Sequence, residues 1–205
     1  MKQGKIFLLS FNSTINEAIA IGPHWLNDKE QQINALEKAE GLPFDFTLKN
    51  QVLVNGRYSY NDDFSQTKII WADLQRNNKG WLLCSERLKT LICEHQKSGD
   101  SIKWVSCNVI HGEEKRKYYI PLFMKEMDLL DNDTSQFYYA DKEKILIKPV
   151  FSISKTQSYS FFSIPTNSGP YWRLSPGAYV VEELKNAIVK ANMTGIVFDK
   201  VFVSD

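Results

Sequence analysis

Residues 80–92 read GWLLCSERLKTLI, and residues 178–188 read AYVVEELKNAI. The two stretches align at an offset of 96 positions, so that Leu83 to Lys89 matches Tyr179 to Lys185. In each stretch a short extended segment leads into an amphipathic helix that begins with a glutamate, whose negative charge complements the positive end of the helix. A further apolar segment of strand type follows each helix. We therefore interpret the repetition as one strand-helix-strand unit, used twice as scaffold.

The spacing of apolar residues predicts the bounds of both helices. The first is predicted over residues 86–97, with Ser85 as its cap and Gly99 as its end. Four residues share one face of it by their spacing: Leu88, Leu91, Ile92 and His95. The second is predicted over residues 182–193, with the same apolar spacing, and ends at Gly195.

The cysteines and histidines show no pattern of a catalytic or metal site. The chain has 3 cysteines and 3 histidines, and they are scattered without a CxxC pair, which argues against a structural zinc site and a secreted disulfide framework. Cys84 and Cys93 are predicted to be small buried packing groups. His95 aligns with Ala191 of the second helix, which favours packing over catalysis.

Composition indicates an ordinary globular protein. A chain of 205 residues is long enough to bury a substantial core. Its 25 basic and 24 acidic side chains give a net charge of +1, so no overall field steers it to a nucleic acid or an anionic membrane. No apolar run approaches the roughly 18 residues of a membrane span. We expect a cytoplasmic protein that binds neither.

Outside the repeat, strand patterns predominate. A strand is predicted over residues 6–11 and a helix over 27–40, capped by Asn27. Strands follow over residues 44–74, with a tight turn at Asn55-Gly56, and later segments predict a hairpin and further strands. The chain is predicted to end in a strand over residues 196–203, with an irregularity in it. The fold class is α+β, with mixed or mainly antiparallel sheets and a few packed helices.

One functional alternative is a metal-dependent hydrolase. Its candidate residues are carboxylates in polar loops and one histidine: Asp62, Asp63, Asp73, Asp128, Asp131 and His111. Residues 131–135, DNDTS, begin like a calcium loop, but Gln136 stands where glycine is needed and Lys142 where a bidentate acid is needed. No nucleotide-binding loop, hydrolase elbow or zinc-protease motif occurs.

Four segments, in this order, carry a family resemblance: LLCSERLKTLI, IKWVSCNVI, YYIPLFMKEMDLLDNDTS and YWRLSPGAYVVEELKNAIVKANMTGIVF. They resemble the immunity proteins of bacterial polymorphic-toxin systems, most closely immunity protein family eleven, with family forty-three as a relative. The resemblance covers roughly residues 80–200 and is closest at the last segment, where Thr194 and Gly195 stand at the expected places. It departs at Pro121 and Lys125, where the family often has asparagine.

The resemblance implies a non-enzymatic cytoplasmic protein that binds the C-terminal domain of a toxin encoded by an adjacent gene, and so protects the producing cell. It offers no catalytic residues, no metal and no cofactor. On this view residues 1–79 form an N-terminal region outside the match and residues 80–205 an immunity-like region, within one compact domain. An intracellular adaptor without a toxin partner is a further alternative, and self-association stays open.

Aromatic residues indicate where a partner would bind. Tryptophan, tyrosine and arginine are the residue types that anchor protein interfaces, although ordinary core packing competes with this role for each of them. Two groups are the candidate partner-binding residues: Tyr58, Tyr60, Asp62, Asp63 and Phe64 in one segment, and Tyr171, Trp172 and Arg173 in another.

Overall fold

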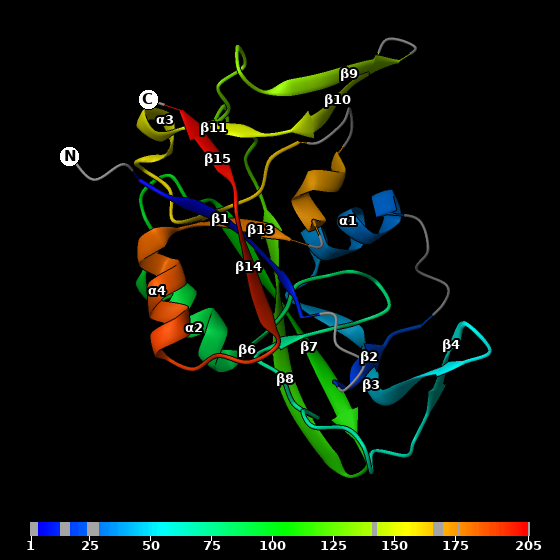
Figure 1. The fold of residues 1–205 in the computed structure, drawn as a ribbon. Helices are drawn as coiled ribbons and strands as arrows, with labels where there is room; N and C mark the ends of the chain where they lie inside the picture. Colours follow the sequence, from blue (N-terminus) through cyan, green and yellow to red (C-terminus); the bar gives the residue numbers. More distant parts are fainter. Residues whose placement is uncertain are drawn as a thin grey trace.

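The computed structural model describes residues 4–12, 17–23, 29–140, 143–165, 170–175 and 177–204. Strands outnumber helices in these ranges (Figure 1), which confirms the predicted α+β class. None of the helices in the described ranges is long and apolar enough to cross a membrane.

The largest sheet has seven strands and mixed direction. Its order is β2-β3-β7-β8-β6-β5, with β4 paired to β3 beyond the main path, and β3 and β7 run parallel while the other pairs are antiparallel. The strands are β2 (Ile19–Ile21), β3 (Gly41–Val54), β4 (Arg57–Asn61), β5 (Leu74–Gln75), β6 (Leu83–Ser85), β7 (Ile102–His111) and β8 (Glu114–Phe123). Strands from the first 79 residues and from the later part of the chain therefore share one sheet.

A second sheet has the order β12-β13-β1-β14. Its strands are β1 (Ile6–Phe11), β12 (Phe161–Phe162), β13 (Ala178–Val181) and β14 (Ile196–Lys200). The predicted first strand is confirmed, and it lies between β13 and β14, antiparallel to both. Two strand pairs complete the fold: antiparallel β9 (Gln136–Ala140) with β10 (Glu143–Lys148), and parallel β11 (Val150–Ser152) with β15 (Phe202–Ser204).

The repeat predicted from sequence is present in three dimensions. The first unit is β6, α2 (Glu86–Glu94) and β7, and the second is β13, α4 (Glu182–Lys190) and β14. The two helices lie side by side (Figure 1), α2 against the seven-stranded sheet and α4 against the four-stranded sheet. Their apolar faces meet in one core cluster through Leu88, Ile92, Leu184 and Ile188. The Ser85 hydroxyl accepts a hydrogen bond from the Leu88 amide at 3.2 Å, as predicted for the cap.

The remaining helical elements are α1 (Lys29–Lys38), α3 (Ile153–Thr156) and the 3-10 helix η1 (Pro170–Leu174). α1 buries Ile33 and Leu36 in the cluster on one face of the seven-stranded sheet. The opposite face of that sheet meets α2, α4 and the four-stranded sheet in a second cluster. A third cluster lies beyond the four-stranded sheet, around Phe151 and Phe162.

The predicted ends of both repeat helices were wrong. Helix α4 ends at Lys190, with Ala191 as its C-cap, and not at residue 193 before Gly195. Helix α2 ends at Glu94, with the partly buried His95 as its C-cap, because the chain turns there and the His95 ring nitrogen Nδ1 bonds the Leu91 carbonyl at 2.9 Å. Gly99 instead bonds the Ser158 carbonyl at 2.8 Å from its amide. The predicted helix cap Asn27 lies outside the described residues.

Of two strands predicted from the sequence, the one near residue 70 is absent and the last one is present with its irregularity. Between residues 67 and 73 the chain forms only an isolated bridge at Ile69, so the continuous strand expected there was wrong. The irregularity expected in the last strand is confirmed. The chain breaks at Val201 between β14 and β15, which pair in different sheets.

Candidate protein-binding site

Residues 51–61, which we call the arm, form the projecting end of the β3–β4 hairpin. Asn55 and Gly56 have φ values of 51° and 75°. Positive φ at both central residues is the signature of a type I′ turn, which suits the twist of a two-residue hairpin. The turn predicted from the Asn-Gly pair is therefore confirmed. All five residues of β4 are exposed.

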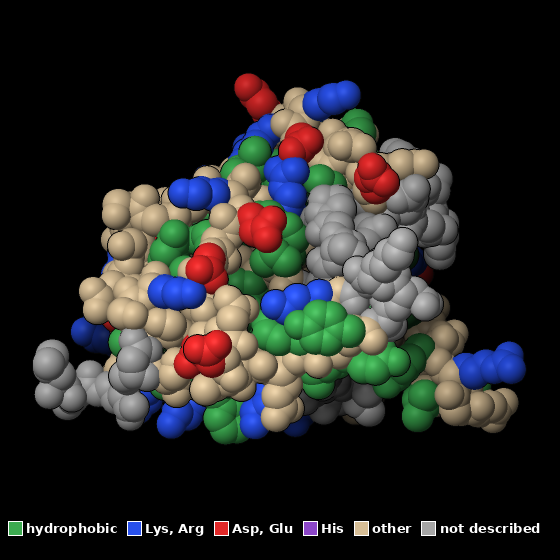
Figure 2. Space-filling model, turned by 90° about the horizontal axis from the view of Figure 1, so that it is seen from above, with side chains coloured by type: hydrophobic (Ala, Val, Ile, Leu, Met, Phe, Trp, Pro, Cys, Tyr) green, Lys and Arg blue, Asp and Glu red, His purple; other side chains and the backbone are tan. Residues whose placement is uncertain are grey.

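One face of the arm is apolar. Leu53 lies opposite Tyr58 across the ladder, and Gln51 lies opposite Tyr60. Because side chains alternate along a strand, Leu53, Tyr58 and Tyr60 share a face. Their exposed fractions are 59%, 61% and 46%. Figure 2 shows the arm reaching out on the right with hydrophobic side chains along it and a basic side chain at its end.

The base of the arm is acidic and well ordered by hydrogen bonds. Asp62 pairs with Lys49 at 2.7 Å between Oδ1 and Nζ. Asp63 accepts a hydrogen bond from the Ser65 amide at 3.0 Å, and this bond holds the pKa of Asp63 below its ordinary value. Arg57 at the tip forms no ion pair with another described residue. The arm therefore has a basic tip and an acidic base.

A set of stacked side chains, which we call the shelf, begins where the arm ends: Phe64, His111, Trp71 and Arg116. The Phe64 ring lies 4.4 Å from the His111 ring between centroids, and Trp71 lies edge-on to His111 at 6.4 Å. The Arg116 guanidinium lies 4.4 Å from the centre of the Trp71 ring. Glu114 holds both members of this cation-π pair, because its Oε1 accepts a hydrogen bond from Arg116 Nε at 2.7 Å and its Oε2 accepts one from Trp71 Nε1 at 3.0 Å.

The shelf borders a cleft of about 580 Å³ at the junction of the two repeats. Its lining includes Trp71, Arg116 and Lys117 on one side and Arg87 and Thr194 on the other. Arg87 is one of the positions at which the two repeat units differ, since Glu183 occupies the matching place. The cleft is open, so it extends the shelf as a surface that a protein partner can reach.

The second predicted group of partner-binding residues lies apart from the arm, in η1. Trp172 is only 8% exposed and belongs to the cluster between the sheets. Arg173 donates from Nε to the Phe123 carbonyl at 2.9 Å and pairs with Glu37. Both side chains therefore hold η1 in place, and little of Trp172 is left for a partner. The Tyr171 side chain lies outside the described part of the structure.

The carboxylates of the hydrolase alternative do not converge. Asp128 pairs with Lys155 at 2.8 Å, and Asp131 accepts hydrogen bonds from the amides of Asp133 and Thr134 in its own turn, at 3.0 and 3.3 Å. The Asp73 carboxylate accepts a hydrogen bond from the Ser85 hydroxyl at the repeat junction. The His111 ring packs against the Phe64 ring in the shelf. Across the described ranges, no three His, Cys, Asp or Glu side chains are close enough to hold a metal ion together.

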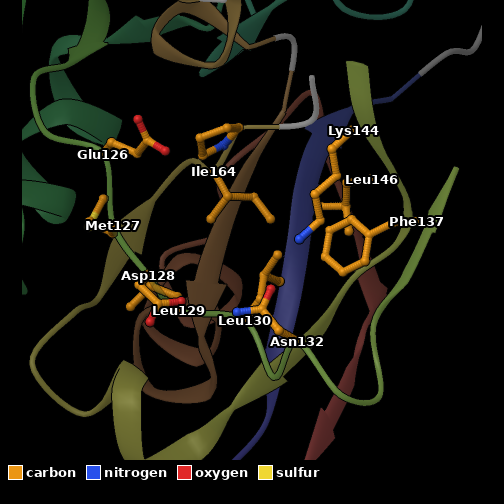
Figure 3. Close-up of a pocket in the computed structure, with 11 residues that line it drawn as sticks. Glu126, Met127, Asp128, Leu129, Leu130, Asn132, Phe137, Lys144, Leu146 and Ile164 are labelled. Atoms are coloured by element: carbon orange, nitrogen blue, oxygen red, sulfur yellow. The ribbon is translucent and has the colours of Figure 1, made fainter. Parts of the chain in front are cut away.

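A smaller pocket of about 250 Å³ lies under the β9–β10 hairpin (Figure 3). Phe137, Leu146 and Ile164 give it apolar walls, and the Lys144 ammonium lies 3.7 Å from the centre of the Phe137 ring. Asp128 reaches its rim, but its carboxylate is already bound by Lys155.

The cysteines differ in environment. Cys84 and Cys107 are buried, and burial raises the pKa of both thiols, to about 12 for Cys107. Cys93 is exposed, so the prediction that it is buried was wrong. It follows Ile92 on the helix and therefore points away from the core that Ile92 enters.

Sequence reasoning missed Leu53 in the arm and the Trp71–Arg116 stack of the shelf. The alternation in QVLV places Leu53 on one face of a strand, but sequence alone does not say that this face lacks a covering layer. Trp71 and Arg116 are distant in sequence and meet only because β8 passes the segment before β5. No local signal marks their contact.

A family model described as Immunity protein family (Imm11) matches residues 22–203. The chain belongs to this family. The Imm11 match begins far upstream of the segment on which the sequence resemblance rests, so most of residues 1–79, the arm included, falls within it. Thr194 and Gly195, which carry part of that resemblance, lie at the repeat junction. A β-carbon on Gly195 would stand 2.4 Å from the Leu74 carbonyl oxygen. No curated protein matches the chain.

Proposed function

We propose that this Imm11 member binds the C-terminal domain of a toxin encoded by an adjacent gene and neutralises it in the cytoplasm without catalysis, so that the producing cell is protected. Membership of an immunity protein family supports the role. The toxin is placed on the arm because the arm has an exposed apolar face, formed by Leu53, Tyr58 and Tyr60.

An exposed face of this composition favours a protein partner. Burying apolar area releases roughly 25 cal/mol per Å², and tyrosines supply large contact area at small conformational cost. The arm projects from the body (Figure 1), so its side chains can enter a concave surface of a partner. The shelf beside it adds a tryptophan and an arginine, the types that most often dominate binding energy.

The partner-binding residues predicted from the sequence take different roles in this proposal. Tyr58, Tyr60 and Phe64 are retained as contact residues of the arm and shelf. Asp62 and Asp63 form the acidic rim, where charges contribute to steering and specificity more than to affinity. Trp172 and Arg173 are assigned to the interior, where they support the scaffold. The adaptor alternative differs only in its partner, and the immunity family favours a toxin.

Co-expression tests the function and its location together. The chain is expressed with the C-terminal domain of the protein encoded by the adjacent gene, and growth and co-purification are measured. We expect the wild type to restore growth and to co-purify. Tyr58→Ala and Tyr60→Ala should lose protection, whereas Tyr139→Ala should retain it, because Tyr139 is a 70% exposed tyrosine on the β9–β10 hairpin and serves as a matched control.

Two results would count against the proposal. If the wild type neither restores growth nor co-purifies, the immunity role itself is wrong. If the arm variants protect as well as the wild type while Tyr139→Ala does not, the role stands and the binding site lies on the other hairpin.

A further inference from the structure

Strand β4 is an edge strand with an open outer side. Among the described strands it pairs only with β3, and all five of its residues are exposed. Natural proteins usually protect such edges with a proline, a bulge or inward-pointing charges. The sequence RYSYN has no proline or glycine, its pairing with β3 has no bulge, and its one charge is the terminal Arg57.

The turn determines which backbone groups of β4 face outward. In a two-residue hairpin the pair that flanks the turn exchanges both hydrogen bonds, and bonded and non-bonded pairs then alternate. Val54 and Arg57 flank the turn here, and Val52 pairs with Ser59 two positions further on. Arg57 and Ser59 therefore bond to β3. The amide and carbonyl groups of Tyr58 and Tyr60 point away from the hairpin.

The same two tyrosines thus offer their side chains on the apolar face and their backbone groups at the open edge. We infer that the toxin domain adds an extended strand to the edge of β4, hydrogen-bonded to the backbone of Tyr58 and Tyr60 and packed against their rings. This inference rests on the proposed function and specifies how the arm is used. Strand addition is an established mode of recognition, in which backbone bonds give affinity and side chains give specificity.

The charges of the arm define the chemistry of the added strand. Arg57 lies at the tip. At the base Asp62 is paired with Lys49, and the exposed Asp63 adds a second negative charge beside it. A complementary strand has an acidic side chain near the tip, a basic one near the base and apolar side chains against the two tyrosines between them.

Size distinguishes a toxin strand from a second copy of this chain. An antiparallel second copy could place its own Tyr60 opposite Tyr58. Pairing through β4 would then engage only five residues of each copy, compared with about 20–30 residues a side in stable interfaces. A toxin bound at this edge can continue onto the shelf, which begins at Phe64 directly after the arm.

Amide hydrogen exchange, resolved by residue with NMR, tests the inference. The probe is the C-terminal domain of the adjacent gene's product, carrying a substitution that abolishes its toxicity. In the free protein we expect the Arg57 and Ser59 amides to exchange slowly and the Tyr58 and Tyr60 amides to exchange fast. In the complex the Tyr58 and Tyr60 amides should slow by at least about 10-fold, as expected for newly bonded groups.

The affinity of proline variants for the toxin domain provides the second measurement. Tyr60→Pro removes an outward amide and a side chain, whereas Tyr60→Ala removes the side chain alone. We expect Tyr60→Pro to bind the toxin domain at least about 10-fold more weakly than Tyr60→Ala, since a partner carbonyl is left unpaired. Slow exchange at Ser59 in Tyr60→Pro shows that the hairpin is intact. Ser59→Pro, which breaks a bond to β3, is the control for loss of the hairpin.

Each outcome is decisive. A complex in which the Tyr58 and Tyr60 amides stay fast, or equal affinity of Tyr60→Pro and Tyr60→Ala, overturns strand addition and leaves the immunity function standing. Slowing that appears without toxin and increases with protein concentration assigns the edge to a second copy and overturns the inference. Absence of any complex with the wild type overturns the proposed function and the inference with it.

Discussion

Asp73 joins the two repeat units, and its replacement should destabilise the whole protein. Its Oδ1 accepts a hydrogen bond from the Ser85 hydroxyl at 2.8 Å, and its Oδ2 accepts one from the Thr194 amide at 2.9 Å and one from the Thr194 hydroxyl at 3.2 Å. Ser85 begins the helix of the first unit, and Thr194 follows the helix of the second. Asp73→Ala removes all three bonds and leaves the Thr194 amide without its acceptor.

The size of the effect follows from these bonds. Hydrogen bonds to charged groups contribute about 1.5–3 kcal/mol each, and neutral ones about 1 kcal/mol. All three bonds are to a carboxylate, but the Asp73 side chain keeps 11% exposure. Water therefore replaces part of each lost bond, and we take a value below the range for charged groups. Three bonds at roughly 1 kcal/mol each give about 3 kcal/mol. For a chain of this size that corresponds to a fall in Tm of about 6–12 °C.

Urea unfolding and thermal melts measure the change. Asp62→Ala is the matched control, because it removes an aspartate whose side chain is 74% exposed and whose ion pair with Lys49 is worth at most about 1 kcal/mol. A double-mutant cycle of Asp73→Ala with Ser85→Ala should show coupling of about 1 kcal/mol. If Asp73→Ala costs no more than Asp62→Ala, Asp73 does not join the units as described.

Three further results are expected. Trp172→Ala should lower the free energy of unfolding by about 3 kcal/mol or more, because the ring is buried. A variant that keeps its stability and loses only toxin binding would contradict the assignment of Trp172 to the interior. Burial raises the pKa of Glu17 above 4.5, so Glu17 should contribute a loss of stability as pH rises from about 4.5 through the raised folded value. In urea titrations Glu17→Gln should remove this contribution and so lose less stability than the wild type over this pH range. An identical pH dependence of the two proteins would contradict the cause. A thiol reagent at pH 8 should label one cysteine, Cys93, in the native protein and all three after denaturation. Labelling of Cys84 or Cys107 in the native protein would show that the core opens.

Local patterns predicted the elements that short-range forces form. Helix α2 begins where Ser85 caps it, and the hairpin turn forms at Asn55-Gly56, because a side-chain oxygen and a permissive φ act within a few residues. The repeat was recognisable for the same reason. The end of α2 was predicted three residues too late, since the periodic pattern includes His95 whereas the helix ends at Glu94 and the chain turns to reach β7.

Long-range neighbours decided what the patterns left open. Residue type did not separate Trp172, which is buried, from Tyr58, which is exposed. Cys93 and Cys84 have similar apolar neighbours in sequence, but only Cys84 faces the core. The last strand was predicted as one, yet β15 leaves its sheet to pair with β11. Each outcome depends on segments far along the chain that cover a residue or leave it open.

The sequence by itself determined the two strand-helix-strand units, the tight turn of the arm and the family resemblance, because each depends on spacing within short segments. The tertiary structure alone decided how the units are joined and which face is open. Asp73 became a junction because Ser85 and Thr194 are brought to it by folding. The edge of β4 became a candidate binding site because no other described strand covers it.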